Sequence, residues 1–80
     1  MASLMFELVK RAGGKFHLFE SFENKSGSLK KYIFFTDMQI KKFIVTEQRE
    51  NNIRRFTGIE EVSELSLRDI KYSVKRSLLN

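Results

Sequence analysis

Hydrophobic and polar residues alternate over much of the first fifty positions, which is the two-residue period of a β-strand. Between residues 15 and 23 this alternation divides the side chains into two predicted faces. One face carries Phe16, Leu18, Glu20 and Phe22, and the other carries His17, Phe19, Ser21 and Glu23. We therefore expect Phe19 to lie outside the main core.

Three further segments also predict strands. Residues 5–11 have the length of a hairpin partner for residues 15–23, because the Gly13-Gly14 pair between them favours a turn. Residues 30–36 contain the run Tyr32-Ile33-Phe34-Phe35, which is apolar on both faces and typical of a central strand. Residues 41–48 repeat that pattern, and the short connection 37–40 would join the two strands as a second hairpin.

The segment 37–50 has an alternative interpretation as a helix. Thr36 and Gln39 have the spacing of a capping box, and apolar residues follow at helical intervals. We favour the strand because Ile44, Val45 and Thr46 form a β-branched triplet, which is stiff in helices and suits a pleated surface.

The C-terminal third predicts two helices. Thr57 and Glu60 have the spacing to cap a short helical turn at 58–64, and Ser66 and Asp69 have the spacing to cap a longer helix at 66–79. The longer helix has an inward stripe made of Leu67, Ile70, Lys71, Val74 and Leu78. The predicted fold class is α+β: an antiparallel sheet of three to four strands, formed by an N-terminal meander, with a C-terminal helix packed on one face. Residues 1–80 contain no proline and no long linker, so we expect a single compact domain.

The amino-acid composition excludes several classes of functional site. The 80 residues include no cysteine, which excludes disulfides, thiolate metal sites and a thiol nucleophile. No apolar run has the length of a membrane span, and the first residues lack the order of a signal peptide. We therefore expect a cytoplasmic protein, either of a cell or of a virus acting inside its host. The formal net charge of +5 favours anionic partners.

Catalytic and metal-binding patterns are weak. His17 is the only histidine, and Gly13-Gly14 lacks the spacing of a phosphate-binding loop. Glu60, Glu61 and Glu64 lie at the start of a predicted helix, where acidic residues favour the helix dipole without any metal. We therefore predict no enzymatic activity, no catalytic residues, no metal and no cofactor.

Basic residues precede an aromatic residue three times, which is the pattern that predicts a binding surface. The pairs are Lys30-Lys31 before Tyr32, Lys41-Lys42 before Phe43, and Arg54-Arg55 before Phe56. Neighbours on a strand point to opposite faces, so the useful pairs are Lys30 with Tyr32 and Lys41 with Phe43. If their face is open, two rings flanked by two ammonium groups could stack on single-stranded bases. If a helix covers that face, the same rings belong to the core.

Two hypotheses for function follow. The first is nucleic-acid binding, to DNA or RNA, mostly through phosphate contacts. Its predicted site residues are Lys30, Lys31, Tyr32, Lys41, Lys42, Phe43, Arg54 and Arg55. The second is a protein-interaction module, such as a small regulator or a virus-encoded inhibitor, that docks on an acidic surface of a larger complex. In either case an exposed strand edge would permit a homodimer. A helix-turn-helix over 58–64 and 66–79 is disfavoured because the link is too tight.

Overall fold

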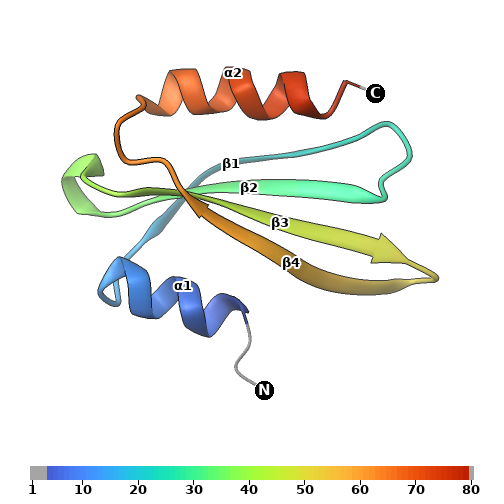
Figure 1. Cartoon of the computed structure of the whole chain (residues 1–80), viewed down its shortest axis with the longest axis horizontal. Helices are drawn as coiled ribbons and strands as arrows, with labels where there is room; N and C mark the ends of the chain where they lie inside the picture. Colours follow the sequence, from blue (N-terminus) through green and yellow to red (C-terminus); the bar gives the residue numbers. More distant parts are fainter. Residues whose placement is uncertain (1–3, 80) are drawn as a thin grey trace.

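A computed structural model describes residues 4–79, which form two helices and four strands. In chain order the elements are α1 (Leu4–Ala12), β1 (His17–Glu23), β2 (Leu29–Phe35), a 3₁₀ turn η1 (Asp37–Gln39), β3 (Lys42–Glu50), β4 (Ile53–Glu61) and α2 (Leu67–Ser77). The strands form one antiparallel sheet in the order β1-β2-β3-β4, so each strand pairs with its neighbour in sequence (Figure 1). The predicted α+β class, with a meander and a C-terminal helix packed on the sheet, is confirmed.

The two helices lie on opposite faces of the sheet and cover different halves of it (Figure 1). Helix α2 packs over β1 and β2, and its buried cluster contains Ile33 and Ile70. Helix α1 packs against β4 from the other side, where Leu8 lies in a buried cluster with Phe43 and Val45. We call these two sides the α2 face and the α1 face. Because each helix covers only part of its face, each face keeps an uncovered area.

Helix α2 follows the sequence prediction closely. The Ser66 hydroxyl accepts a hydrogen bond from the Asp69 amide at 3.2 Å, which is the expected N-cap. The four apolar members of the predicted stripe are buried, namely Leu67, Ile70, Val74 and Leu78. Lys71, at the margin of the stripe, donates to Glu20 on β1 at 2.8 Å. One helix face therefore meets the sheet, as the 3.6-residue period predicts.

The prediction of a strand at residues 5–11 is wrong, because these residues belong to helix α1. Its inward residues recur at helical intervals and include the fully buried Leu8. The Gly13-Gly14 pair ends the helix instead of turning a hairpin. The Gly14 amide donates to the Val9 carbonyl at 3.0 Å and the Gly13 amide to the Lys10 carbonyl at 3.4 Å, and both glycines have positive φ. This is the Schellman arrangement that closes helices, and positive φ there suits glycine.

The prediction of a short helix at 58–64 is also wrong, because residues 53–61 form the fourth strand. Asn51 and Asn52 make a two-residue turn with φ values of 51° and 65°, which is the backbone that joins hairpin strands tightly. Strand β4 therefore pairs with β3 from the turn onward, and Thr57 and Glu60 lie within the strand. Since residues 58–64 are not a helix, the arrangement of a helix-turn-helix is absent from the described chain.

The strand interpretation of 37–50 is confirmed for β3. The connection before it contains the 3₁₀ turn, and the Thr36 hydroxyl accepts a hydrogen bond from the Lys41 amide at 3.0 Å. This polar contact closes the hairpin between β2 and β3. The β-branched residues 44–46 lie in the middle of the strand, as predicted.

Two register shifts change which side chains share a face. In β1 the shift lies between Leu18 and Glu20, so Phe19 packs against the α2 cluster, contrary to its predicted place outside the core. Glu20 therefore faces α2 and no longer shares a face with Leu18. The second shift places Thr57 as an extra residue in β4, opposite the step from Thr46 to Glu47. Such bulges reverse the alternation of faces beyond them.

Neither helix within residues 4–79 has the length and apolar character needed to cross a membrane.

Candidate nucleic-acid interface

The uncovered part of the α1 face lies toward the turn between β3 and β4. Three cations and two rings gather there, and we call this group the tip surface: Lys30, Tyr32, Arg49, Arg54 and Phe56. The residues come from three adjacent strands, because antiparallel pairing sets directly opposite residues on the same face. Lys30 lies opposite Glu47, which lies opposite Phe56, and Arg49 lies opposite Arg54 one step nearer the turn.

The two rings of the tip surface are in contact with each other. The centroids of Tyr32 and Phe56 are 6.2 Å apart with the planes inclined at 56°. The Tyr32 hydroxyl donates to Oε1 of Glu47 at 3.2 Å, and the Glu47 side chain is buried. This hydrogen bond fixes the orientation of the tyrosine ring. Phe56 is 40% exposed, so an apolar ring is offered to solvent beside a fixed one.

The cations surround these rings. The Lys30 ammonium lies 5.0 Å from the centroid of Tyr32, which is a cation–π distance. Arg49 and Arg54 are both exposed and directly opposite each other on neighbouring strands. Like charges directly opposite each other destabilise a hairpin. None of the three cations Lys30, Arg49 and Arg54 forms an ion pair within residues 4–79. An anion bound between the two arginines would relieve their repulsion.

Two carboxylates border the same surface. Glu23 lies opposite Lys30 on the β1 side, and Glu47 lies opposite it on the β3 side. Lys30 is therefore flanked by negative charge, whereas Arg49 and Arg54 have a cation opposite them. The positive end of the tip surface is the arginine pair, next to the Asn51-Asn52 turn.

Only part of the predicted site comes together. Lys30, Tyr32 and Arg54 share the tip surface, as the spacing of Lys30 and Tyr32 predicts. Lys31 and Arg55 lie on the α2 face, opposite Phe22 and Gln48 respectively. These two cations therefore cannot contact the same bound group as the tip surface without the partner passing around the sheet edge.

The Lys41-Lys42-Phe43 segment has a structural role. Lys41 precedes β3 at the opposite end of the sheet and donates to the Arg11 carbonyl at 3.3 Å. The Lys42 side chain is buried and donates to the Ser63 carbonyl at 3.1 Å. Phe43 is fully buried beneath α1 with Leu8. Of the two alternatives for Phe43, the covered one holds, and the covering helix is α1.

Arg49 and Phe56 were absent from the predicted site. Their signal in the sequence is the Asn51-Asn52 turn, because a two-residue turn fixes which residues lie opposite each other. Once residues 53–61 are assigned to a strand, that turn pairs Arg49 with Arg54 and brings Phe56 onto the face of Tyr32. The sequence prediction misses this pairing because it places Arg54 and Arg55 in a connection before a short helix at 58–64.

Catalytic and metal-binding geometry is weak within residues 4–79. The His17 Nε2 atom lies 2.7 Å from Oδ1 of Asp37, with both side chains more than half exposed. No group of three or more metal-ligating side chains is found in this range. Glu60 and Glu61 point to opposite faces of the sheet, since they lie opposite Ile44 and Phe43.

A separate hollow of about 500 Å³ lies between the end of α2 and the turn that joins β1 to β2. It is lined by Phe22, Glu23, Lys25, Lys75, Leu78 and Leu79. Its walls are mainly aliphatic and aromatic, and its two lysines lie at different places, on the β1–β2 turn and on α2. The tip surface, which combines three cations with two rings, is therefore the better candidate for a binding site.

No protein-family model matches the chain, and comparison with curated proteins and with solved structures finds no significant similarity.

Proposed function

We propose that this protein binds single-stranded nucleic acid, DNA or RNA, through the tip surface. The observation that supports the proposal is the pair of adjoining rings, Tyr32 and Phe56, beside three cations that form no ion pair in residues 4–79. Rings stack on unpaired bases, and basic side chains neutralise phosphates. Tyr32 packs at the margin of the α1 cluster, whereas Arg49, Arg54 and Phe56 lie beyond it and are exposed to a polymer passing over the sheet.

The charges suggest how the strand would lie. The arginine pair Arg49 and Arg54 would hold phosphates near the turn, where no carboxylate lies opposite them. Glu23 and Glu47 flank Lys30 and would repel phosphate from the other end of the surface. A bound backbone is therefore expected to follow the arginine side, with its bases directed toward the rings.

Base recognition is expected to be weak. The Tyr32 hydroxyl already donates to Glu47, and the ring is stacked on Phe34 at 6.1 Å and covered by the Lys30 ammonium at 5.0 Å, so Phe56 is the ring that offers a surface to a base. Phe56 has no polar group. Stacking on such rings tolerates any base, because every base has an aromatic face. We therefore expect little discrimination among sequences and a clear preference for single strands over duplex.

Fluorescence anisotropy with labelled oligonucleotides tests the proposal over a salt series. The variant Arg49→Gln should bind more weakly, and its log–log salt slope should be shallower by about 0.7, the value for one single-strand phosphate contact. The matched control is Arg76→Gln on the exposed side of α2, which removes the same charge from a different surface. The control should keep the slope of the unmodified protein.

The rings are tested separately. Phe56→Ala should lose about 1–3 kcal/mol of binding free energy, whereas Tyr32→Phe, which keeps the ring, should bind as before. A flat titration at low salt, or an equal loss of slope in the α2 control, would contradict the proposal.

A further inference from the structure

We propose that β4 pairs with β4 of a second copy of this chain, in antiparallel orientation, so that the sheet continues across a two-fold symmetric dimer. Strand β4 is an edge of the sheet, with β3 on one side and no strand of residues 4–79 on the other. An edge strand presents unpaired main-chain groups to any chain of suitable register. The choice of a second copy as the partner follows from the residues of β4 itself.

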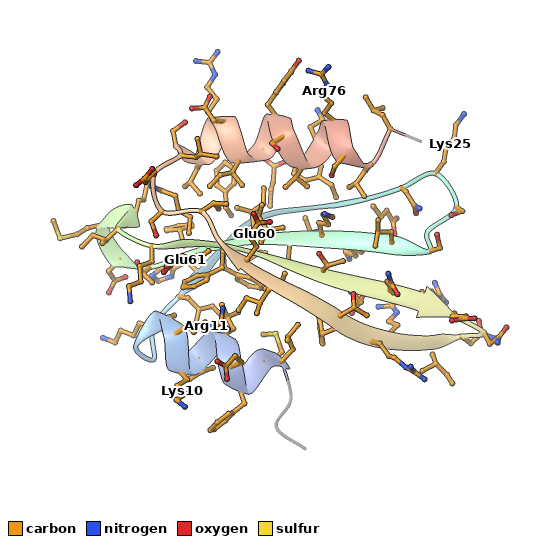
Figure 2. The ribbon with its side chains drawn as sticks, viewed as in Figure 1. Lys10, Arg11, Lys25, Glu60, Glu61 and Arg76 are labelled. Carbon is orange, nitrogen blue, oxygen red and sulfur yellow. The ribbon has the colours of Figure 1, made fainter. Side chains whose placement is uncertain are left out.

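The charges of β4 are complementary to those of a second β4 that runs in the opposite direction. Arg54 and Arg55 follow Ile53 at the start of the strand, and Glu60 and Glu61 end it, far from the β3–β4 turn (Figure 2). A two-fold axis between residues 57 and 58 would place each arginine of one copy opposite a glutamate of the other. Arg54 would meet Glu61, and Arg55 would meet Glu60. Opposite charges that face each other across an antiparallel pair stabilise it.

The bulge at Thr57 makes these pairs share a face. In a regular strand, residues 54 and 61 would point to opposite sides, because they are an odd number of positions apart. The extra residue reverses the alternation, so Arg54, Phe56, Ile59 and Glu61 all lie on the α1 face, opposite Arg49, Glu47, Val45 and Phe43 of β3. Arg55 and Glu60 both lie on the α2 face, opposite Gln48 and Ile44.

The main-chain groups favour the same register. The Val62 amide donates to the Lys42 carbonyl at 2.8 Å, so it points toward β3. Peptide groups alternate along a strand, so those of Glu61 point outward. At the other end, Glu50 and Ile53 close the two-residue turn with groups that point toward each other, so those of Arg54 point outward as well. Both members of the Arg54 and Glu61 pair are therefore directed at the second copy.

A register shifted by one residue loses this agreement. Arg54 would then lie opposite Glu60, whose side chain is on the other face and whose peptide groups are directed at β3. The charges, faces and main-chain directions thus select one arrangement. In that arrangement Phe56 would also lie opposite Ile59, and Phe56 is 40% exposed in the single chain.

The dimer is compatible with the proposed nucleic-acid site but does not depend on it. Arg54 belongs to both surfaces, so in the dimer phosphate contacts would fall mainly on Arg49. The variant Glu60→Arg/Glu61→Arg tests the dimer without changing the tip surface, because Glu60 and Glu61 lie at the far end of β4 from it (Figure 2).

Sedimentation velocity over a protein concentration series tests the dimer. The unmodified chain should shift from monomer to dimer as concentration rises. Two variants should remain monomeric alone: Arg54→Glu/Arg55→Glu, and Glu60→Arg/Glu61→Arg. Each variant gives the four charged residues of the strand the same sign. The four attractive pairs of the dimer then become repulsive, so the dissociation constant should rise by at least about tenfold. An equimolar mixture of the two variants should associate, because each supplies the charge that the other lacks.

The matched control is Glu50→Arg/Glu64→Arg, which raises the net charge by the same amount as Glu60→Arg/Glu61→Arg but lies outside β4. It should dimerise like the unmodified chain. Circular dichroism of every variant checks that the fold is retained. The proposal is overturned if the unmodified chain is monomeric at every concentration, if the mixed variants do not associate, or if the control loses the dimer equally. A monomer would mean that the charges and the bulge protect the edge from pairing.

Discussion

Replacement of Leu8 by alanine should weaken the packing of helix α1 on the sheet and lower the free energy of unfolding. Leu8 is fully buried and lies between the helix and the buried Phe43 and Val45. The change removes three carbon atoms, worth about 2.4 kcal/mol at about 0.8 kcal/mol each, and leaves a cavity that adds to the loss. We therefore expect the free energy of unfolding to fall by about 3 kcal/mol. A domain of this size has about 4–12 kcal/mol in total, so the loss is large.

Urea denaturation followed by circular dichroism measures this change, at the same low protein concentration for each variant. The matched control is Val9→Ala on the same helix, because Val9 is 41% exposed and lies outside the buried cluster. The control should stay within about 0.5 kcal/mol of the unmodified protein. A cost for Leu8→Ala below about 1 kcal/mol, or one equal to that of the control, would refute the packing described for α1.

Two further predictions concern local contacts. Ser66→Ala should lower the free energy of unfolding by about 1 kcal/mol in urea denaturation, because it removes the N-cap of α2. The control Ser73→Ala, on the exposed side of the same helix, should not lower it. Lys42→Met should leave oligonucleotide affinity unchanged in the anisotropy assay. It should lower the free energy of unfolding by about 1 kcal/mol, because it removes the hydrogen bond that the Lys42 ammonium donates to the Ser63 carbonyl. A clear loss of affinity would show that Lys42 reaches the nucleic acid.

The parts of the fold that could be predicted from sequence are those where local signals agree. Helix α2 has a capping serine and a regular apolar stripe, and both appear in the structure as predicted. Strand β2 was recognised from its run of aromatic and β-branched residues. Its apolar character on both faces has a simple cause, because helices lie on both sides of the sheet.

The failures occurred where one short pattern fits two structures. The Gly13-Gly14 pair suits a hairpin turn and a helix C-terminus equally, and only the partners of its amides distinguish them. Thr57 and Glu60 have the spacing of a capping box, yet pairing with β3 outweighs that local preference. The bulge at Phe19 leaves no clear mark in the sequence, so the faces of β1 could not be assigned correctly.

The candidate site shows the same division. Lys30 and Tyr32 are two apart on one strand, so their shared face and cation–π contact follow from strand geometry alone. Arg49, Arg54 and Phe56 join them only through pairing between strands. Phe43 was correctly placed on the face of Tyr32, but the helix that buries it was not predicted as a helix.

The strand order of the sheet has a consequence for how the chain folds. Every strand pairs with its neighbour in sequence, through connections of a few residues, so the entropy lost in closing each pairing is small. Contacts that are close in sequence favour rapid folding. The 80 residues also contain no proline, so slow isomerisation of prolyl bonds cannot delay the process. The sheet is therefore expected to form by successive zipping of adjacent hairpins, with the two terminal helices docking onto it from opposite sides.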